Sequence, residues 1–394
     1  MTVSQWRRSS NPTSETCDVV VVGAGIAGVS AALDLERRGL EVVVLERDQP
    51  AAGASGRNAG FLMRGCAENY EIAGREYGRD RAKALWKLTE DNLAGLRAEG
   101  IDRLASVRRV PSCLLALEEA EREELRRSAA MMREDGFAVE WLEGPGAGPD
   151  DAIWRPRDGK PRALAALVNP DDGACNPLDV LGLLLRKMRA PVRQRAEVVG
   201  IDDGPGGHSV IVRTAEGMIQ AGHALVCANA YVGLLLPRIA RLAAPKRAQM
   251  LAARFRPDAG VRLLMSYYAN HGYEYFRQTN DGTVVVGGWR KAHADEEVGY
   301  EDRTTAPVQE GLEGFAKRLL GDAFEITARW SGVMGFSPDH LPVVGAVEGF
   351  ASRRVWFCGG FTGHGMSMGY RTAQIATAAM LEGAPNMFDL QRLG

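Results

Sequence analysis

The chain has 394 residues, of which 25% are charged and 45% hydrophobic, and its formal net charge is −2. A chain of this length exceeds what one hydrophobic core organises, which predicts two joined domains. The near-neutral charge gives no electrostatic reason to expect nucleic acid or an anionic membrane surface as a partner.

Residues 1–16 are expected to form a loose leader. Arg7 and Arg8 do not begin a twin-arginine signal, because the segment that follows them is polar. The most apolar stretch, residues 19–33, contains glycines and is too short to cross a bilayer. Six cysteines are scattered without a C-x-x-C pair, which favours reduced thiols over disulfides or a zinc site. We therefore expect a cytoplasmic protein with no membrane span and no metal.

Residues 18–46 predict a strand, a tight glycine turn, a helix and a second strand. Gly23 permits a sharp exit from the first strand, Gly25 lets the backbone approach a diphosphate, and Gly28 lets the helix pack on the sheet. Glu46 ends the second strand, where a carboxylate can accept hydrogen bonds from a ribose. The unit predicts dinucleotide binding.

A second glycine-rich loop covers residues 53–60. Its small residues, together with Ser55, Arg57 and exposed backbone N–H groups, predict another anion-binding concavity beside the first. Two such loops close together indicate a diphosphate held from both sides. Residues 68–143 then show a helical pattern whose charge runs are most simply solvated helix faces.

The middle of the chain alternates turns with short elements. Residues 169–177 form a turn, and residues 178–188 are predicted to be a helix begun by a proline. Short β runs at 197–201, 209–214 and 223–228 predict an antiparallel meander leading to a buried strand. From 237 to 329 the chain is strand-like and rich in aromatic residues, which either form core or line a pocket: Tyr267, Tyr268, Tyr273, Tyr275, Phe276 and Trp289.

The last part repeats the strand, glycine loop and helix pattern. An apolar strand at 355–358 leads into a glycine-rich loop at 359–369, and a helical run follows to about residue 381. The N-terminus of this helix can face a delocalised negative charge.

Together these loops resemble the FAD-dependent amine and amino-acid oxidoreductases of the D-amino-acid oxidase superfamily, which includes glycine oxidase, sarcosine oxidase and γ-glutamylputrescine oxidase. The resemblance spans nearly the whole chain in the expected order. It rests on residues 18–46, 53–60, 172–177, 275–282 with 286–288, 338–342 and 360–366.

The resemblance implies an α/β fold, with a Rossmann-like FAD-binding domain and a second α+β substrate domain whose antiparallel sheet lies over the flavin. The FAD-binding domain would be discontinuous and comprise residues 1–85, 150–235 and 330–394. The substrate domain would comprise residues 86–149 and 236–329.

The resemblance also assigns cofactor contacts, residue by residue. The diphosphate would be held by Gly23, Gly25, Ile26 and Ala27, and the adenosine by Glu46 and Arg47, with Val198 on the adenine side and Ala228 and Asn229 nearby. The diphosphate and the isoalloxazine edge would contact Ala54, Ser55, Arg57, Asn58, Ala59 and Gly60. The flavin carbonyl edge would contact Phe361, Thr362, Gly363, His364, Gly365 and Met366, and the helix that follows would stabilise an anionic reduced flavin.

Departures from the family patterns bear on the substrate. No cysteine stands near Gly332, where sarcosine oxidases attach the flavin, so FAD is expected to be non-covalent. Ser367 replaces a carboxylate-binding lysine, and Asp339 and His340 stand where D-amino-acid oxidases use an arginine. Either the substrate is an amine without an adjacent carboxylate, or another cation holds that carboxylate. The candidate cations are Arg64, Arg277 and Arg290.

The expected reaction is oxidation of a C–N bond in an amine or amino acid by hydride transfer to FAD, which gives an imine that water hydrolyses. Oxygen would then reoxidise the flavin, and hydrogen peroxide would be released. Tyr275 and Arg277 are predicted to face the substrate, and His340 is either the general base or a packed loop histidine. The lysine that promotes oxygen reaction in sarcosine oxidases is missing from residues 283–286, and Lys246 and Lys291 are possible substitutes. A dehydrogenase that uses a quinone or protein acceptor, or an electron-transfer subunit, remains an alternative. The sequence does not indicate the oligomeric state.

Overall fold

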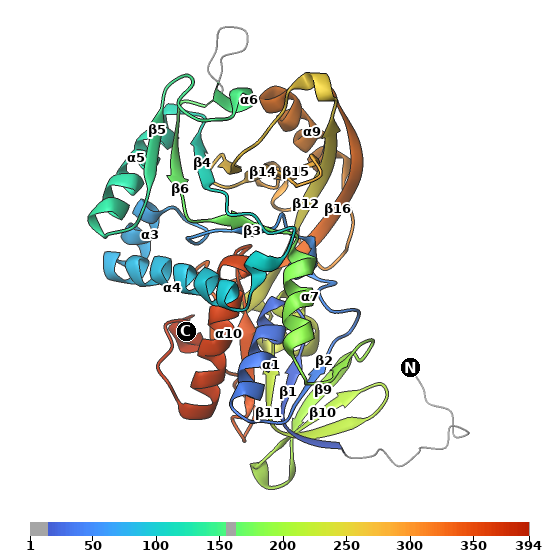
Figure 1. Ribbon diagram of the computed structural model, residues 1–394. Helices are drawn as coiled ribbons and strands as arrows, with labels where there is room; N and C mark the ends of the chain where they lie inside the picture. Colours follow the sequence, from blue (N-terminus) through green and yellow to red (C-terminus); the bar gives the residue numbers. More distant parts are fainter. Residues whose placement is uncertain (1–14, 155–162, 394) are drawn as a thin grey trace.

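The computed structural model describes residues 15–154 and 163–393, and two large sheets organise it (Figure 1). The first sheet follows the order β17-β18-β11-β1-β2-β8, with β10 beside β11 and β9 beside β10. From β18 to β8 all neighbours pair in parallel. Its strands are β1 (Glu15–Val22), β2 (Val42–Leu45), β8 (Val192–Arg193), β9 (Val198–Asp203), β10 (Val210–Thr214), β11 (Met218–Val226), β17 (Val343–Ala346) and β18 (Val355–Gly359).

The predicted strand–helix–strand unit is confirmed as β1, α1 (Ile26–Arg37) and β2. Strands β1 and β2 are parallel neighbours, and the residues of β2 are all buried. Gly23 has φ of +104°, and a Cβ on Gly28 would lie 1.9 Å from the Gly23 carbonyl oxygen. Both glycines are therefore needed for the turn and for the close packing of α1.

The second sheet follows the order β16-β12-β15-β14-β13-β4-β6-β5, and a separate two-stranded sheet pairs β3 with β7. All neighbours in the second sheet are antiparallel except β13 and β4. The strands are β3 (Phe61–Leu62), β4 (Ser112–Ala116), β5 (Glu140–Glu143), β6 (Ala165–Asn169), β7 (Gly173–Ala174), β12 (Ala244–Phe255), β13 (Ser266–Ala269), β14 (Glu274–Gln278), β15 (Val284–Gly288) and β16 (Phe324–Phe336).

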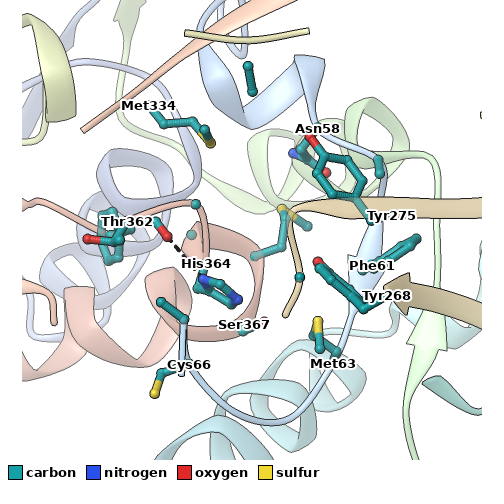
Figure 2. A pocket seen from close by; sticks show the side chains of 18 of the residues that line it. Asn58, Phe61, Met63, Cys66, Tyr268, Tyr275, Met334, Thr362, His364 and Ser367 are labelled. Atoms are coloured by element: carbon teal, nitrogen blue, oxygen red, sulfur yellow. Dashed lines mark hydrogen bonds between the residues drawn. The ribbon is translucent and has the colours of Figure 1, made fainter. Parts of the chain in front are cut away.

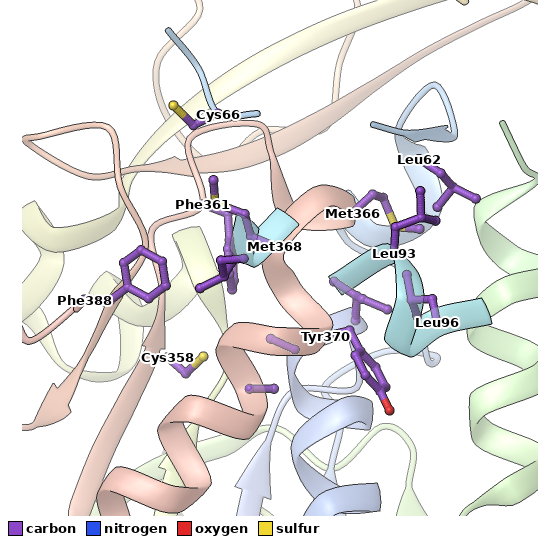
Figure 3. Close-up of a cluster of buried hydrophobic side chains, with 14 of the residues drawn as sticks. Leu62, Cys66, Leu93, Leu96, Cys358, Phe361, Met366, Met368, Tyr370 and Phe388 are labelled. Carbon is purple, nitrogen blue, oxygen red and sulfur yellow. The ribbon is translucent and has the colours of Figure 1, made fainter. Parts of the chain in front are cut away.

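Helices cover both sheets. They are α2 (Ala54–Arg57), α3 (Tyr70–Tyr77), α4 (Arg79–Ala98), α5 (Glu119–Glu134), α6 (Asp151–Trp154), α7 (Pro177–Lys187), α8 (Val232–Leu235), α9 (Ala306–Leu320) and α10 (Gly365–Glu382). Helix α10 packs on α1 and α4, and Figure 3 shows Met366 of α10 beside Leu93 of α4, while Met368 lies near Phe361. This apolar cluster fixes the start of α10 relative to the first sheet.

Side-chain alternation gives the second sheet two different faces. Tyr267 on β13 and Phe276 on β14 pack in one core cluster with α9. Their chain neighbours Tyr268 and Tyr275 pack with Phe61 in a separate cluster on the other face. Since successive residues of a strand point to opposite faces, this second face is available to line a site.

Most of the predicted elements are confirmed, including α7 and the β9–β10–β11 meander. The helical pattern expected for 68–143 is confirmed at α3, α4 and α5, but it is wrong at β4 and β5, which also lie within this range. The expected leader, residues 1–16, lies mostly outside the described residues, and β1 already begins at Glu15. The domain boundaries stay a prediction, although β6, which we assigned to the FAD-binding domain, pairs with β4 and β5 in the second sheet.

Across residues 15–154 and 163–393, no helix is long and apolar enough to cross a membrane. In the same ranges, no group of three or more histidine, cysteine, aspartate or glutamate side chains could hold a metal ion.

Candidate active site

A cavity of about 430 Å³ lies where the loops of the first sheet meet the second face of the second sheet (Figure 2). It brings together predicted residues from distant parts of the chain. Those that line it are Gly25, Ile26, Ala27, Ala54, Ser55, Arg57, Asn58, Ala59, Asn229, Tyr275, His340, Phe361, Thr362, Gly363, His364, Gly365 and Met366. Gly23, Glu46, Arg47, Gly60, Val198, Ala228 and Arg277 are not among its lining residues.

The N-terminus of α1 fits the diphosphate of FAD. Gly25 precedes the helix without a side-chain cap, and the first turn contains no acidic residue. The backbone N–H of Ile26 donates to the Ser55 hydroxyl, 3.0 Å away, and a Cβ on Gly25 would lie 2.9 Å from that hydroxyl oxygen. The open helix end and the missing Cβ together leave the kind of space and polarity that a phosphate requires.

Glu46 stands at the end of β2, beside the glycine turn. Its carboxylate accepts hydrogen bonds from the backbone N–H of Ala24 at 2.7 Å and of Asp48 at 2.9 Å. The Arg47 guanidinium lies 4.5 Å from the ring centroid of Tyr231. The roles of Glu46 and Arg47 in holding the adenosine stay predictions.

The loop of residues 53–60 is shaped by its own polar side chains. The Arg57 guanidinium forms an ion pair with Asp302 at 2.7 Å and donates to the backbone carbonyls of Ala52 and Ser331. The amide group of Asn58 donates to the carbonyls of Ala54 and Ser55, and its oxygen accepts from the N–H of Gly60. Arg57 thus holds the loop against β16, Asn58 fixes the internal shape of the loop, and both side chains line the cavity.

Arg277, which we predicted to face the substrate, donates a hydrogen bond to the loop of residues 53–60, and its role at the substrate stays a prediction. Its guanidinium donates to the carbonyl oxygen of Ala59 and, at 2.5 Å, to that of Cys175. The side chain is buried, and this burial lowers its pKa to about 10. A Cβ on Gly60 would lie 2.0 Å from the Cys175 carbonyl oxygen, so the loop passes closely over this point.

Tyr275 and Tyr268 present their rings to the cavity from neighbouring strands (Figure 2). Phe61 packs edge-on against Tyr268, with ring centroids 4.9 Å apart. Within residues 15–154 and 163–393, neither tyrosine hydroxyl has a hydrogen-bond partner. Burial raises the pKa of Tyr275 to about 12 and raises that of Tyr268 further, so both are neutral donors at pH 7. From the sequence, Tyr268 was one of several aromatic residues that could form core or line a pocket; the alternation of side chains on β13 is the signal that places it in the site.

The three candidate arginines have different surroundings. Arg64 is buried, donates to the Ala138 carbonyl and pairs with Glu90 at 3.3 Å. Arg277 donates to the backbone carbonyls of Ala59 and Cys175. Arg290 lines the cavity, and its guanidinium lies 4.7 Å from the ring centroid of Phe336. In the described part of the chain, Arg290 has no carboxylate partner.

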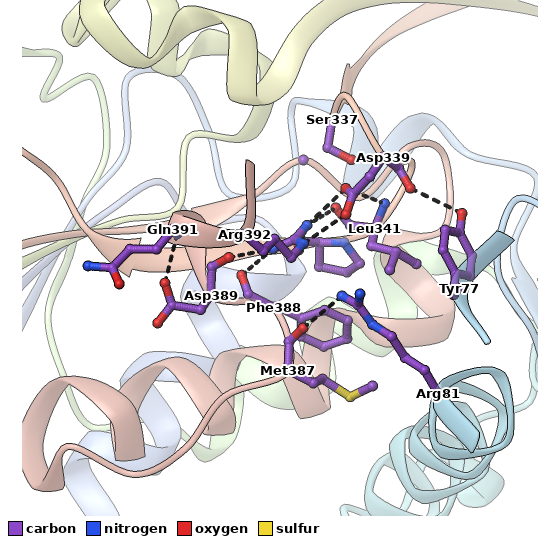
Figure 4. Close-up of polar contacts among 12 residues, drawn as sticks. Tyr77, Arg81, Ser337, Asp339, Leu341, Met387, Phe388, Asp389, Gln391 and Arg392 are labelled. Atoms are coloured by element: carbon purple, nitrogen blue, oxygen red, sulfur yellow. Dashed lines mark hydrogen bonds and ion pairs between the residues drawn. The ribbon is translucent and has the colours of Figure 1, made fainter. Parts of the chain in front are cut away.

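His340 lies in a loop that is held in place by the contacts of its neighbour Asp339. Figure 4 shows Asp339 paired with Arg392, whose guanidinium lies 2.8 Å from its carboxylate, while the Tyr77 hydroxyl donates to the Asp339 carbonyl at 3.1 Å. On the inner side, Nδ1 of His340 lies 3.1 Å from Oε1 of Glu68. This hydrogen bond raises the pKa of His340, with the Glu68 charge adding to it.

The N-terminus of α10 also faces the cavity. His364 precedes the helix, Gly365 and Met366 begin it, and its first turn contains no acidic residue. A positive helix end beside the cavity fits the negative charge that a reduced flavin carries. Lys246 and Lys291, the possible oxygen-directing lysines, are not among the lining residues. The cavity also includes residues that were not predicted from the sequence, namely Met63, Glu68, Glu121, Glu124, Met250, His271, Met334 and Phe336.

Known proteins share this sequence pattern and fold. The γ-glutamylputrescine oxidoreductase of Escherichia coli (strain K12) is 26% identical over 385 residues, which are 95% of this chain and 86% of that protein. The glycine oxidase of Bacillus licheniformis is 27% identical over 384 residues, 93% of this chain and 94% of that protein. The crystal structure of glycine oxidase from Geobacillus kaustophilus matches with a TM-score of 0.78 and 20% identity, covering 97% of this chain and 98% of that one.

The resemblance found in the sequence is confirmed by these matches, and the α/β fold is the one they share. The sequence profile of the DAO family, described as FAD dependent oxidoreductase, matches residues 18–379. The chain therefore belongs to the DAO family of FAD-dependent oxidoreductases.

Proposed function

We propose that the protein oxidises the C–N bond of an amino compound that also carries a carboxylate, and that oxygen accepts the electrons. The observation that carries the proposal is Arg290, the cation in the cavity wall that has no carboxylate partner among the described residues. A guanidinium in an apolar, aromatic setting is well suited to bind a carboxylate through two parallel hydrogen bonds. The substrates in the names of the two curated relatives, glycine and γ-glutamylputrescine, both combine an amine with a carboxylate.

The other groups of the cavity support this chemistry. Bound FAD supplies the two-electron acceptor for a hydride from the carbon beside the nitrogen. Tyr268 and Tyr275 offer neutral hydroxyl donors, and Phe61, Met63 and Met250 keep the wall apolar. An apolar cavity with a few polar groups excludes water and strengthens the hold of Arg290 on an anion.

Matched ligand pairs test the role of Arg290. Sarcosine and dimethylamine differ by the carboxylate, as do glycine and methylamine. In anaerobic stopped-flow reduction, we expect the carboxylated member of a pair to be favoured in the wild type by about 100-fold or more in kred/Kd, as a charge-assisted bidentate bond of about 3 kcal/mol implies. Arg290→Met should lower that preference at least tenfold, and Arg290→Lys should restore part of it.

The matched control is Arg318→Met, because Arg318 also stacks on an aromatic ring, that of Trp289, but lies outside the cavity. It should leave the preference unchanged. A preference that survives Arg290→Met would show that another group holds the carboxylate, and a wild type without any preference would favour an amine that lacks one. Flavin that is reduced by substrate but reoxidised slowly in air would favour the dehydrogenase alternative over the oxidase.

A further inference from the structure

The ring of His364 has a defined tautomer when it is neutral. Its Nδ1 lies 3.0 Å from the backbone carbonyl oxygen of Thr362. A carbonyl oxygen can only accept, so Nδ1 carries the hydrogen atom and the lone pair is on Nε2. In residues 15–154 and 163–393, Nε2 has no hydrogen-bond partner. A basic nitrogen without a partner is therefore present in the wall of the cavity.

The surroundings of His364 favour its neutral form. Burial lowers the pKa of the ring, and the charge of His340 on the neighbouring loop acts in the same direction. The charge of Glu68 and the hydrogen bond to Thr362 act the other way, and the net shift is downward. The ring also stands at the positive end of α10, where a second positive charge is disfavoured. His364 is thus a base with its lone pair available at pH 7.

We propose that Nε2 of His364 is the general base that takes the ammonium proton from the bound substrate. This inference rests on the proposed function. The N–H bond of the substrate ammonium breaks, its electron pair stays on the substrate nitrogen, and the proton forms the new bond to Nε2. The neutral amine that results can then lose a hydride from the adjacent carbon, with FAD as the acceptor, because its free lone pair stabilises the developing imine.

His340, the histidine named from the sequence, is less suited to this step. Its Nδ1 faces the carboxylate of Glu68 at 3.1 Å, and that partner holds a proton on the ring. Its side chain is 46% exposed, so a proton taken there is shared with solvent. Tyr268 and Tyr275 are neutral donors and cannot accept an ammonium proton. Figure 2 shows the His364 ring on the cavity side of its loop, near Ser367 and opposite the tyrosine pair.

The pH dependence of flavin reduction tests the proposal in the holoenzyme. Using sarcosine, glycine and γ-glutamylputrescine as probes, we expect wild-type kred/Kd to be high from below the ordinary histidine pKa of about 6.5 up to the pKa of the substrate amine, about 10 for an alkylamine. His364→Gln should lower kred/Kd at pH 7 by about 100-fold or more, the usual effect of losing a general base. At pH 10 the variant should approach the wild type, because the free amine then needs no base.

His208→Gln is the matched control, because His208 lies on the turn between β9 and β10 and not in the cavity. It should keep the wild-type pH profile. The FAD content and melting temperature of both variants identify any loss due to misfolding. A uniform loss at all pH values in His364→Gln would show a structural role and overturn the proposal while the proposed function stands.

A second readout does not use turnover. Nitrogen-15 spectra of histidine-labelled holoenzyme, assigned with His364→Gln, should show His364 neutral at pH 7.5 with its hydrogen on Nδ1. An imidazolium, or a hydrogen on Nε2, would overturn the proposal for any substrate. If none of the probes reduces the flavin of the wild type, the proposed function is contradicted, and the proton transfer to His364 is contradicted with it.

Discussion

Tyr268 on β13 and Tyr275 on β14 occupy directly opposite positions in the second sheet, and their ring centroids lie 5.7 Å apart. Both hydroxyls lack a protein partner in the described chain, so their hydrogen-bonding capacity is available to a ligand. Tyr275→Phe should therefore raise the Kd for substrate by about 3- to 10-fold, the value of one neutral hydrogen bond, and leave the melting temperature nearly unchanged. Anaerobic stopped-flow titration and thermal unfolding measure the two effects.

The neighbouring Tyr267 provides the contrast, because its hydroxyl donates to the buried carboxylate of Asp150 on the other face of β13. Tyr267→Phe should lower the free energy of unfolding by about 1–3 kcal/mol and leave the Kd for substrate unchanged. Equal effects of both variants on the Kd for substrate would show that the two faces of β13 are not separated as described.

Arg277 connects β14 of the second sheet to the loop of residues 53–60. Arg277→Met removes its charge-assisted hydrogen bonds to the carbonyls of Ala59 and Cys175, and we expect about 3 kcal/mol less stability and weaker FAD retention. Urea unfolding and the FAD content after dialysis measure these losses. If Arg277→Met keeps its FAD and its stability but loses substrate reduction, then Arg277 acts on the substrate as the sequence first suggested.

The pair of His340 and Glu68 should make a small, pH-dependent contribution. Their hydrogen bond raises the pKa of His340 and lowers that of Glu68. The ion pair needs a charged Glu68, so its contribution to the free energy of unfolding is present above the unfolded glutamate pKa near 4.5. It also needs a charged His340, so this contribution is lost as pH rises through the raised pKa of His340. A double-mutant cycle should therefore give a coupling of at most about 1 kcal/mol at pH 6, since the pair is partly exposed, and none at pH 9. Equal coupling at both pH values would contradict this.

Glu99, at the C-terminal end of α4, joins this helix to three other helices. Its carboxylate binds Arg37 of α1 at 2.6 Å, Lys187 of α7 at 2.9 Å and the Tyr370 hydroxyl of α10 at 2.6 Å. The hydrogen bond from Arg37 is the main cause that lowers the pKa of Glu99 to about 2. Glu99→Gln should cost about 2 kcal/mol at pH 7.

The sign of this effect follows from the lowered pKa. The stabilisation by Glu99 is complete above pH 4.5 and is lost as pH falls toward about 2, so the difference between wild type and Glu99→Gln in urea unfolding should narrow from pH 7 to pH 3. A difference that stays constant with pH would show that the charge of Glu99 does not stabilise the fold.

Local sequence signals predicted the β1–α1–β2 unit of the first sheet well. The unit around Gly23 and Gly28 needs only short-range rules, because strand, turn and helix follow one another within a few residues. Strand β4 was missed because its few residues lie between two strongly charged helices, and it becomes a strand only through pairing with β6 and β13. Such non-local pairing overrides the local pattern.

The substrate side was predicted less well, for a similar reason. The sequence indicates that Arg277 and Arg290 stand near the cavity, but only the fold shows that one binds loop carbonyls and the other has no carboxylate partner among the described residues. The pairing of His340 with Glu68 joins residues far apart in the chain, which no spacing rule detects. The alternation of Tyr267 and Tyr268 along β13 is a local signal in the second sheet that separates a core side chain from one that lines the cavity.

The most direct test of the account is anaerobic addition of glycine, sarcosine, γ-glutamylputrescine and putrescine to the oxidised holoenzyme, followed by air. We predict that at least one carboxylate-bearing amine bleaches the yellow flavin and that air restores the colour with release of peroxide. Flavin that dithionite bleaches but none of these amines reduces would contradict the assignment of C–N bond oxidation to this cavity.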